Sequence, residues 1–162
     1  MATLSALKFS TPDGAERMEQ TLLGLQKQQL IQVHDAAVVT WPQGAKKPKT
    51  KQLRNLAGVG ALDGAFWGML FGLIFFVPFF GLAIGAAVGA LAGHFADYGI
   101  DDKFIRQTRE KVTEGTSALF LLTSGGVADK LVDALKDEKF EIISTNLPKE
   151  QEDKLRAAFS AD

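Results

Sequence analysis

The feature that most constrains this chain is a run of 30 consecutive residues, 64–93, without a charged side chain. Six of the 12 phenylalanines fall inside it. A helix built from such a run is apolar on every side, so it must be hidden from water all round. The rest of the chain has the charge content of a water-exposed protein. The mean hydropathy of +0.05 therefore averages two unlike parts.

Glycines recur at every fourth position in two sets in and around this run. A spacing of four keeps each set on one face of a helix with 3.6 residues per turn. The two sets are mirror images about the middle of the run, where Val77 and Pro78 interrupt a helix. We therefore expect a glycine-zipper hairpin of two antiparallel helices, about 56–76 and 79–97, packed through their glycine faces. The eight glycines are Gly60, Gly64, Gly68, Gly72, Gly81, Gly85, Gly89 and Gly93.

The length of these helices predicts a membrane partner. At ~1.5 Å per residue each is about 30 Å long, close to the hydrocarbon core of a bilayer. Eight glycines inside helices would cost a water-soluble core about 8 kcal/mol, which favours membrane lipid as the surrounding medium. The turn carries no polar group, which leaves open whether the hairpin spans the bilayer. The alternative is a water-soluble oligomer whose hairpins bury one another.

A basic cluster stands just before the apolar run. Such a cluster suits anionic head groups on the cytoplasmic side of a membrane, and a solvated loop is the alternative interpretation. No secretory signal precedes it, because residues 1–30 are polar and patterned as a helix. We expect the cytoplasmic face of the inner (plasma) membrane, or else a soluble cytoplasmic assembly. The predicted head-group contacts are Lys46, Lys47, Lys49, Lys51 and Arg54.

The two flanking arms share one order of elements, strand–helix–strand. The first arm predicts a strand at 5–10, a helix at 11–28 capped by Thr11, and a strand at 30–41. The second predicts strands at 118–123 and 140–145 around a helix that begins after Ser124. A further helix is expected from Pro148 onward.

Two βαβ units in one small protein predict an α+β, ferredoxin-like domain. The glycine-zipper hairpin would be inserted between its halves. We assign residues 1–52 to the first half and a basic linker, and 53–98 to the hairpin. Residues 99–162 contain a connecting helix, the second half and the C-terminal helix.

Candidate chemistry is sparse. The chain has no cysteine, which excludes disulfides, a thiolate nucleophile and Cys-ligated metals. Its net charge of -1 argues against nucleic acid as a partner. The hairpin would bring Asp63 and His94 within about one helical turn. They are either an intramembrane polar pair that relays protons or holds a cation, or an inert hydrogen-bonded pair at head-group depth. We expect no enzymatic activity, no cofactor and no resident metal.

Several segments together carry a family resemblance. They are ALDGAFWGMLFGLIFFVPFFGLAIGAAVGALAG at 61–93, GIDDKFIRQTREKV at 99–112, SALFLL at 117–122 and QEDKLRAAF at 151–159. This set resembles a bacterial family of small predicted membrane proteins that is classed as a domain of unknown function. The resemblance extends over nearly the whole chain. It implies a membrane location and no established activity, catalytic residue or cofactor.

These observations predict a non-enzymatic, membrane-associated protein that self-assembles into homo-oligomers through its glycine faces. One alternative is a channel or transporter component built from oligomerised hairpins. Its polar lining would have to come from Asp63 and His94, which argues against an ion path. A ligand-sensing module would rest on fold analogy alone.

Overall fold

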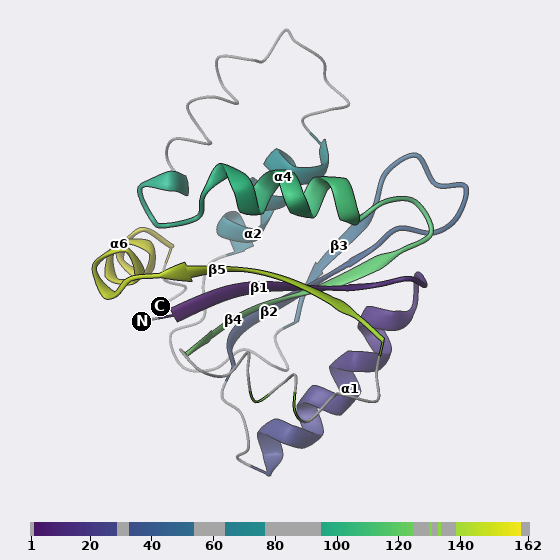
Figure 1. Cartoon of the computed structure of the whole chain (residues 1–162), viewed down its shortest axis with the longest axis horizontal. Coiled ribbons are helices and arrows are strands. Elements are labelled where there is room, and N and C mark those ends of the chain that lie inside the picture. Colours follow the sequence, from purple (N-terminus) through teal and green to yellow (C-terminus); the bar gives the residue numbers. More distant parts are fainter. Residues whose placement is uncertain are drawn as a thin grey trace, which may run out of the picture.

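The computed structural model describes residues 2–28, 33–53, 64–76, 95–124, 130, 133 and 139–159. These residues form an α+β fold with one five-stranded antiparallel sheet and helices on both of its faces (Figure 1). The strands are β1 (Ala2–Phe9), β2 (Val33–Thr40), β3 (Lys49–Gln52), β4 (Ser117–Ser124) and β5 (Glu141–Leu147). The helices are α1 (Gly14–Lys27), α2 (Gly64–Phe71), the π-helical turn η1 (Gly72–Phe76), α4 (Asp102–Lys111) and α6 (Lys149–Phe159).

The strand order is β3-β2-β4-β1-β5, so β3 and β5 form the two edges. Every neighbouring pair is antiparallel. In the centre, Leu4 of β1 lies between Leu122 of β4 and Thr145 of β5. The strands β1 and β5 are thus neighbours in the sheet, although they lie near opposite ends of the chain.

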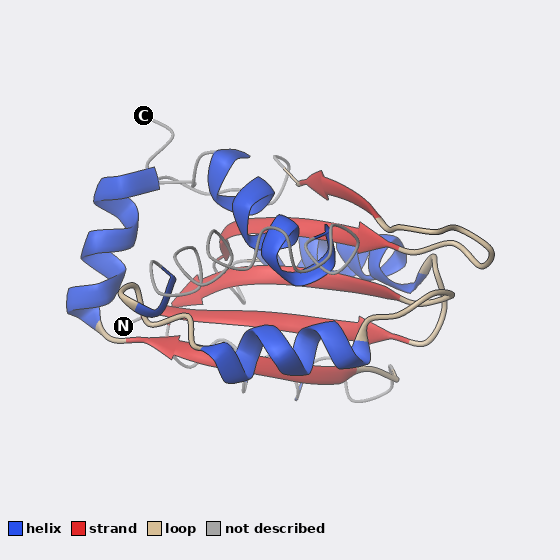
Figure 2. Ribbon diagram, turned by 90° about the horizontal axis from the view of Figure 1, so that it is seen from above, coloured by secondary structure: helices blue, strands red, loops and turns tan. Residues whose placement is uncertain are grey.

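Both faces of the sheet are apolar, because alternate residues of a strand point to opposite sides. One face, here the α2 face, is covered by α2, η1 and α4, and the other, the α1 face, by α1 (Figures 1 and 2). The α2 face includes Leu4, Ala6, Ala37, Val39, Phe120 and Leu122. The α1 face includes Leu7, Phe9, Val38, Leu119 and Leu121.

The start of α1 is held by a strand that lies far away in the sequence. The Ser117 hydroxyl of β4 accepts a hydrogen bond from the Ala15 amide at 3.0 Å and donates one to the Thr11 carbonyl at 2.7 Å. Asp13 occupies the N-cap position and makes no capping bond with its side chain. The predicted Thr11 cap is therefore wrong. The sheet provides the acceptor that a local side chain would otherwise supply.

A turn at Gly99 leads into α4. Gly99 has a φ of +91°, a conformation that glycine adopts without the steric penalty of a side chain. Asp101 then caps α4, because its carboxylate accepts from the Phe104 amide at 2.9 Å. The acidic side chains at this position thus complement the positive end of the helix.

The first half of the predicted hairpin differs from the expectation. A continuous helix at 56–76 was predicted, whereas the described part is α2 followed by the π-helical turn η1. Residues 56–63 of that predicted helix lie outside the described residues, so the structure tests it from Gly64 onward. Across the described ranges, no helix combines the length and the apolar character that crossing a membrane requires.

The sequence predicted that lipid or neighbouring hairpins hide the apolar run, whereas the chain's own sheet covers one side of residues 64–75. The aromatic side of α2 and η1 packs on the α2 face of the sheet, where Phe66, Leu70 and Ile74 are fully buried. The turn at Val77–Pro78 and residues 79–94 of the second predicted helix lie outside the described residues. The domain boundaries remain a prediction.

The remaining elements agree with the sequence to within a few residues, apart from β3, which was assigned to a basic linker. The four other strands and the helices α1, α4 and α6 were predicted in this order. The ferredoxin-like arrangement is a finer statement than these elements establish, because most of residues 125–138, between β4 and β5, lies outside the described part.

Candidate functional site

A buried carboxylate marks the place where the apolar run attaches to the sheet. Asp35 of β2 is completely buried and lies at an irregularity in the pairing of β2 with β4. Its Oδ2 accepts from the Trp67 indole Nε1 of α2 at 2.9 Å, and its Oδ1 from the Ala36 amide at 2.8 Å. The side-chain amide of Gln52 in β3 donates through Nε2 to both oxygens, at 3.3 Å to Oδ1 and 3.2 Å to Oδ2. Asp35 therefore joins three elements: β2, β3 and α2.

These hydrogen bonds offset the free-energy cost of removing the carboxylate from water, as is usual for buried polar groups. Both oxygens act as acceptors, as the oxygens of an ionised carboxylate do. The sequence analysis did not identify Asp35 as a candidate residue. The available signal was an acidic residue within the otherwise apolar strand VHDAAVVT, a position where an exposed carboxylate is not expected.

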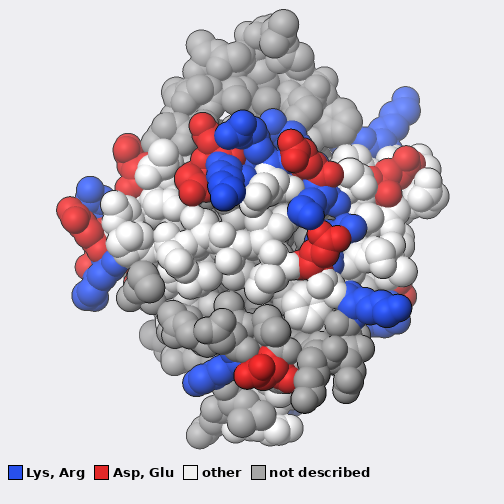
Figure 3. All heavy atoms as spheres, viewed as in Figure 1, with Lys and Arg blue, Asp and Glu red and all other residues white. Residues whose placement is uncertain are grey.

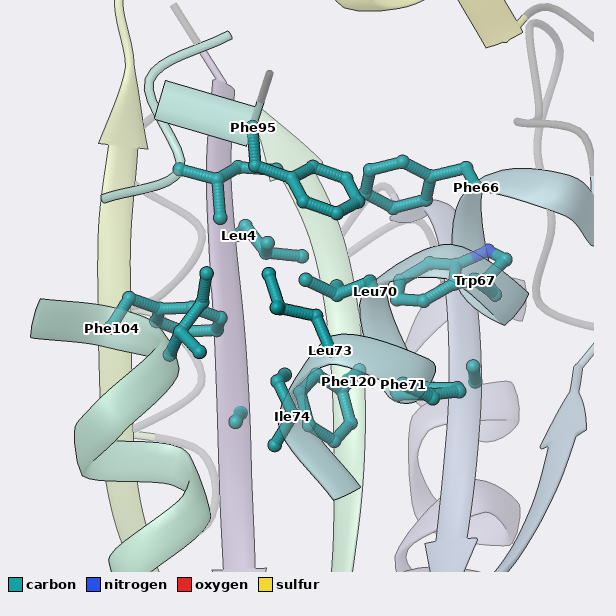
Figure 4. Close-up of a cluster of buried hydrophobic side chains, with 14 of the residues drawn as sticks. Leu4, Phe66, Trp67, Leu70, Phe71, Leu73, Ile74, Phe95, Phe104 and Phe120 are labelled. Carbon is teal, nitrogen blue, oxygen red and sulfur yellow. The ribbon is translucent and has the colours of Figure 1, made fainter. Parts of the chain in front are cut away.

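An aromatic cluster lies around Trp67, whose indole donates to Asp35 (Figure 4). The rings of Phe71 and Phe120 meet edge-on with centroids 4.9 Å apart, and Trp67 lies 5.6 Å from Phe71. Phe66 packs against Phe95 at 6.0 Å, edge-on, so the residues on either side of 77–94 are brought together. Aromatic pairs in such geometries contribute about 0.5–1.5 kcal/mol each beyond their buried area. This side of α2 is thus buried against the sheet.

Arg109 of α4 holds the other end of the segment. Its Nε donates to the Ile74 carbonyl at 3.1 Å and its Nη2 to the Leu73 carbonyl at 2.8 Å. Carbonyls near the end of a helix lack partners within the helix, and a cation there also complements the helix dipole. The α2–η1 segment is therefore fixed at one end by Asp35 and at the other by Arg109.

The opposite side of α2 has a different character. Gly64, Ala65 and Gly68 are exposed, and Gly72 is half-buried. Among the described residues, a Cβ atom at Gly68 or Gly72 would meet nothing within 4 Å, and at Gly64 it would approach the Gln52 side chain at 3.5 Å. We name these three glycines the glycine face of α2, although Gly72 is the first residue of η1. Its neighbours in α2 and η1 are uncharged, so an exposed surface of small residues lies directly over the aromatic core.

The other predicted glycines and the polar pair fall outside the described residues. They are Gly60, Gly81, Gly85, Gly89 and Gly93, together with Asp63 and His94. Arg54 of the basic cluster is also outside. The relation of these residues to the glycine face of α2 therefore stays a prediction.

The structure divides the predicted basic cluster. Lys46 and Lys47 lie exposed in the loop between β2 and β3. Lys49 and Lys51 pair with Thr40 and Val38 of β2, so they project on the α1 face, away from α2. There they line a surface groove of about 780 Å³ beside α1. The acidic side chains across this groove are Asp13, Glu16 and Glu19.

The chemistry of the described residues is that of packing and anchoring. No group of three or more His, Asp or Glu side chains in the described ranges is arranged to hold a metal ion. Among the described residues, Glu141 of β5 has a lowered pKa, because Lys111 donates a hydrogen bond to its carboxylate and the charges of Lys111 and Lys8 favour the ionised form. The ion pair between Lys111 Nζ and Glu141 Oε2, 2.7 Å apart, is exposed and links α4 to the edge strand β5.

Comparison with known proteins gives one match. The family model with the description "Protein of unknown function (DUF1269)" matches residues 61–160, which is well over half of the chain. No curated protein and no solved structure matches the chain. The matched range runs from the apolar segment to the last helix, α6. It thus includes Trp67 and Arg109, which anchor α2 and η1 to the rest of the fold.

Proposed function

The chain belongs to this family of proteins of unknown function, and we propose that it is a non-enzymatic protein that self-assembles through the glycine face of α2. The observation that carries the proposal is an uncharged face, with Gly64, Ala65 and Gly68 exposed, on a helix whose other side is buried. Water-exposed helix faces in soluble domains ordinarily carry polar side chains. A face of this kind is suited to contact with another helix.

The glycines strengthen the argument because the described fold does not need them. A Cβ atom at Gly68 or Gly72 would touch none of the described residues, whereas a helix-interior glycine costs about 1 kcal/mol relative to alanine. Retention of both despite this penalty is explained if a second backbone approaches there. Small residues at four-residue spacing allow such an approach. We propose that a neighbouring copy of the chain supplies this backbone.

The proposal is tested with Gly68→Leu. The new side chain has room in the described fold and raises helix propensity, so the protein is expected to fold while its assembly is blocked. Gly24→Leu in α1 is a matched control, since a Cβ at Gly24 also meets nothing within 4 Å. We expect light scattering after gel filtration to show a lower molar mass for Gly68→Leu alone. A Gly68→Leu protein with the molar mass of the unmodified chain would refute self-association through this face.

Membrane attachment of the assembly is a separate part of the proposal. It is supported by the uncharged run 64–93 and by the exposed lysines between β2 and β3. Burial of the aromatic side of α2 in the protein's own core instead favours an assembly that does not need lipid there. Fractionation followed by an alkaline carbonate wash distinguishes the two. Retention in the washed pellet supports an integral protein, and release as a large particle supports the oligomer that buries its own hairpins.

We also propose that the domain is ferredoxin-like with the hairpin inserted between its halves. The order of the four predicted strands supports this, since β2, β4, β1 and β5 are neighbours in that sequence and all antiparallel. Two interleaved βαβ units produce this order. An experimental structure with a helix from residues 126–138 on the α1 face is the expected result.

A further inference from the structure

The two edge strands of the sheet differ in how they are protected. β3 has four residues, of which Lys49 and Lys51 are exposed, and short lysine-bearing edges resist pairing with other strands. β5 has seven residues, EIISTNL, with one charged side chain at its start and no proline. Within the described part of the chain, β5 pairs with β1 alone. Its outer backbone groups are therefore a template for another strand.

The surface around β5 is also uncharged. Ile142, Ser144 and Asn146 are exposed, and Ile142, at 38%, is the large hydrophobic side chain that the described residues leave most open to water. In Figure 3, drawn in the view of Figure 1, uncharged atoms fill the middle of the molecule, where β5 lies, below the charged side chains of α4. An uncharged edge of this length is normally covered or paired.

A second copy of β5 fits this edge in one particular antiparallel register. With Thr145 on a twofold axis, the partner's Leu147 lies opposite Ile143 on the α2 face, and the partner's Asn146 lies opposite Ser144 on the α1 face. Apolar residues thus meet apolar ones and polar residues meet polar ones on both sides of the sheet. A one-residue slip would lose this match, because it moves side chains to the opposite face.

Charge favours the antiparallel orientation. Glu141 lies at the start of β5 and Lys149 at the start of α6, just after the strand ends, so the twofold axis brings the acidic end of each strand toward the basic end of the other. Both side chains already have an exposed partner on their own chain, Lys111 and Asp153 respectively. These contacts therefore favour the antiparallel orientation and contribute little to affinity.

We infer that β5 is a homodimerisation edge, where two copies pair antiparallel about Thr145 and form one continuous ten-stranded sheet. This interface extends the proposed self-association and shares no residue with the glycine face of α2. A chain with both interfaces can form assemblies larger than a dimer. The occupant of the edge is a second copy, because about Thr145 the side chains of the strand face side chains of like character and its two ends carry opposite charges.

Single cysteines test the register directly, since the chain has none of its own. Residues 144 and 146 of opposing strands would be about 4.5–5.5 Å apart between Cα atoms, within the range for a disulfide. We expect a mixture of Ser144→Cys and Asn146→Cys chains to form a disulfide-linked dimer at least tenfold faster than either chain alone. Thr50→Cys, exposed on β3, is the matched control for random collision. Equal cross-linking of the mixture and the control would overturn the inference.

A second measurement separates this interface from the glycine face. Ser144→Lys introduces a lysine at an exposed position of β5, and Thr50→Lys adds the same charge to the other edge. We expect Ser144→Lys to weaken dimerisation at least tenfold in sedimentation equilibrium and Thr50→Lys to leave it unchanged. Unchanged dimerisation of Ser144→Lys would overturn the β5 interface while leaving the effect of Gly68→Leu as the independent test of the proposed function.

Discussion

Trp67→Phe tests whether the buried carboxylate fixes α2 to the sheet. The substitution keeps an aromatic ring among Phe66, Phe71 and Phe120 but removes the indole N–H that donates to Asp35 at 2.9 Å. A hydrogen bond to a charged group contributes about 1.5–3 kcal/mol. Loss of part of the buried ring adds about 1 kcal/mol. We expect the free energy of unfolding to fall by roughly 2.5–4 kcal/mol.

The chain offers a matched control in its second tryptophan. Trp41 also donates through Nε1, at 3.0 Å, but to the neutral Ala45 carbonyl and from a partly exposed position. A neutral bond contributes about 0.5–1.5 kcal/mol, so Trp41→Phe should be milder by roughly 1.5 kcal/mol. With a urea m-value of ~1.5 kcal/mol/M, that difference moves the midpoint of denaturation by about 1 M. Far-UV circular dichroism follows both variants without depending on either indole.

A double-mutant cycle assigns the effect to the pair. Asp35→Asn, Trp67→Phe and the double variant should give a coupling energy of about 1 kcal/mol or more, because the two groups are in direct contact. Equal destabilisation by Trp67→Phe and Trp41→Phe, together with a coupling energy near zero, would refute the reasoning. The aromatic packing would then hold α2 without help from Asp35.

Two further predictions concern α4. Arg109→Met should lower the free energy of unfolding by about 2 kcal/mol, because the Leu73 and Ile74 carbonyls lose their donors. Thermal melting measures this effect, with Arg106→Met on the exposed side of α4 as the control. Equal shifts in Tm for the two variants would contradict the prediction. The Lys111–Glu141 pair should add stability above the ordinary Glu141 pKa of about 4.5 and lose it as the pH falls through the lowered pKa, since the folded state favours the ionised carboxylate. Urea midpoints at neutral and acidic pH should therefore show a smaller acid-dependent loss for Lys111→Met, and an identical loss would count against the link.

Local signals in the sequence were sufficient for most elements. Short apolar runs with flanking turn residues located β1, β2, β4 and β5 to within a few residues. These signals are local because the composition of a short run and its turn residues depend on neighbouring positions alone. The four-residue spacing of the glycines also gave the face of α2 on which Gly64 and Gly68 lie. The match to a family of unknown function agrees with the resemblance drawn from the sequence.

Other features followed from contacts between distant residues. β3 is a polar segment, KTKQ, that becomes a strand because β2 provides a partner for it. Asp35 is an anchor because the fold brings Gln52 and Trp67 to its carboxylate, and the Ser117 cap of α1 depends equally on a distant strand. The apolar sequence showed that α2 must be hidden from water. The hydrophobic effect is non-directional, so the sequence did not indicate which surface would cover the helix. The tertiary structure decided that the sheet itself covers the aromatic side of α2, which leaves the glycine face outward.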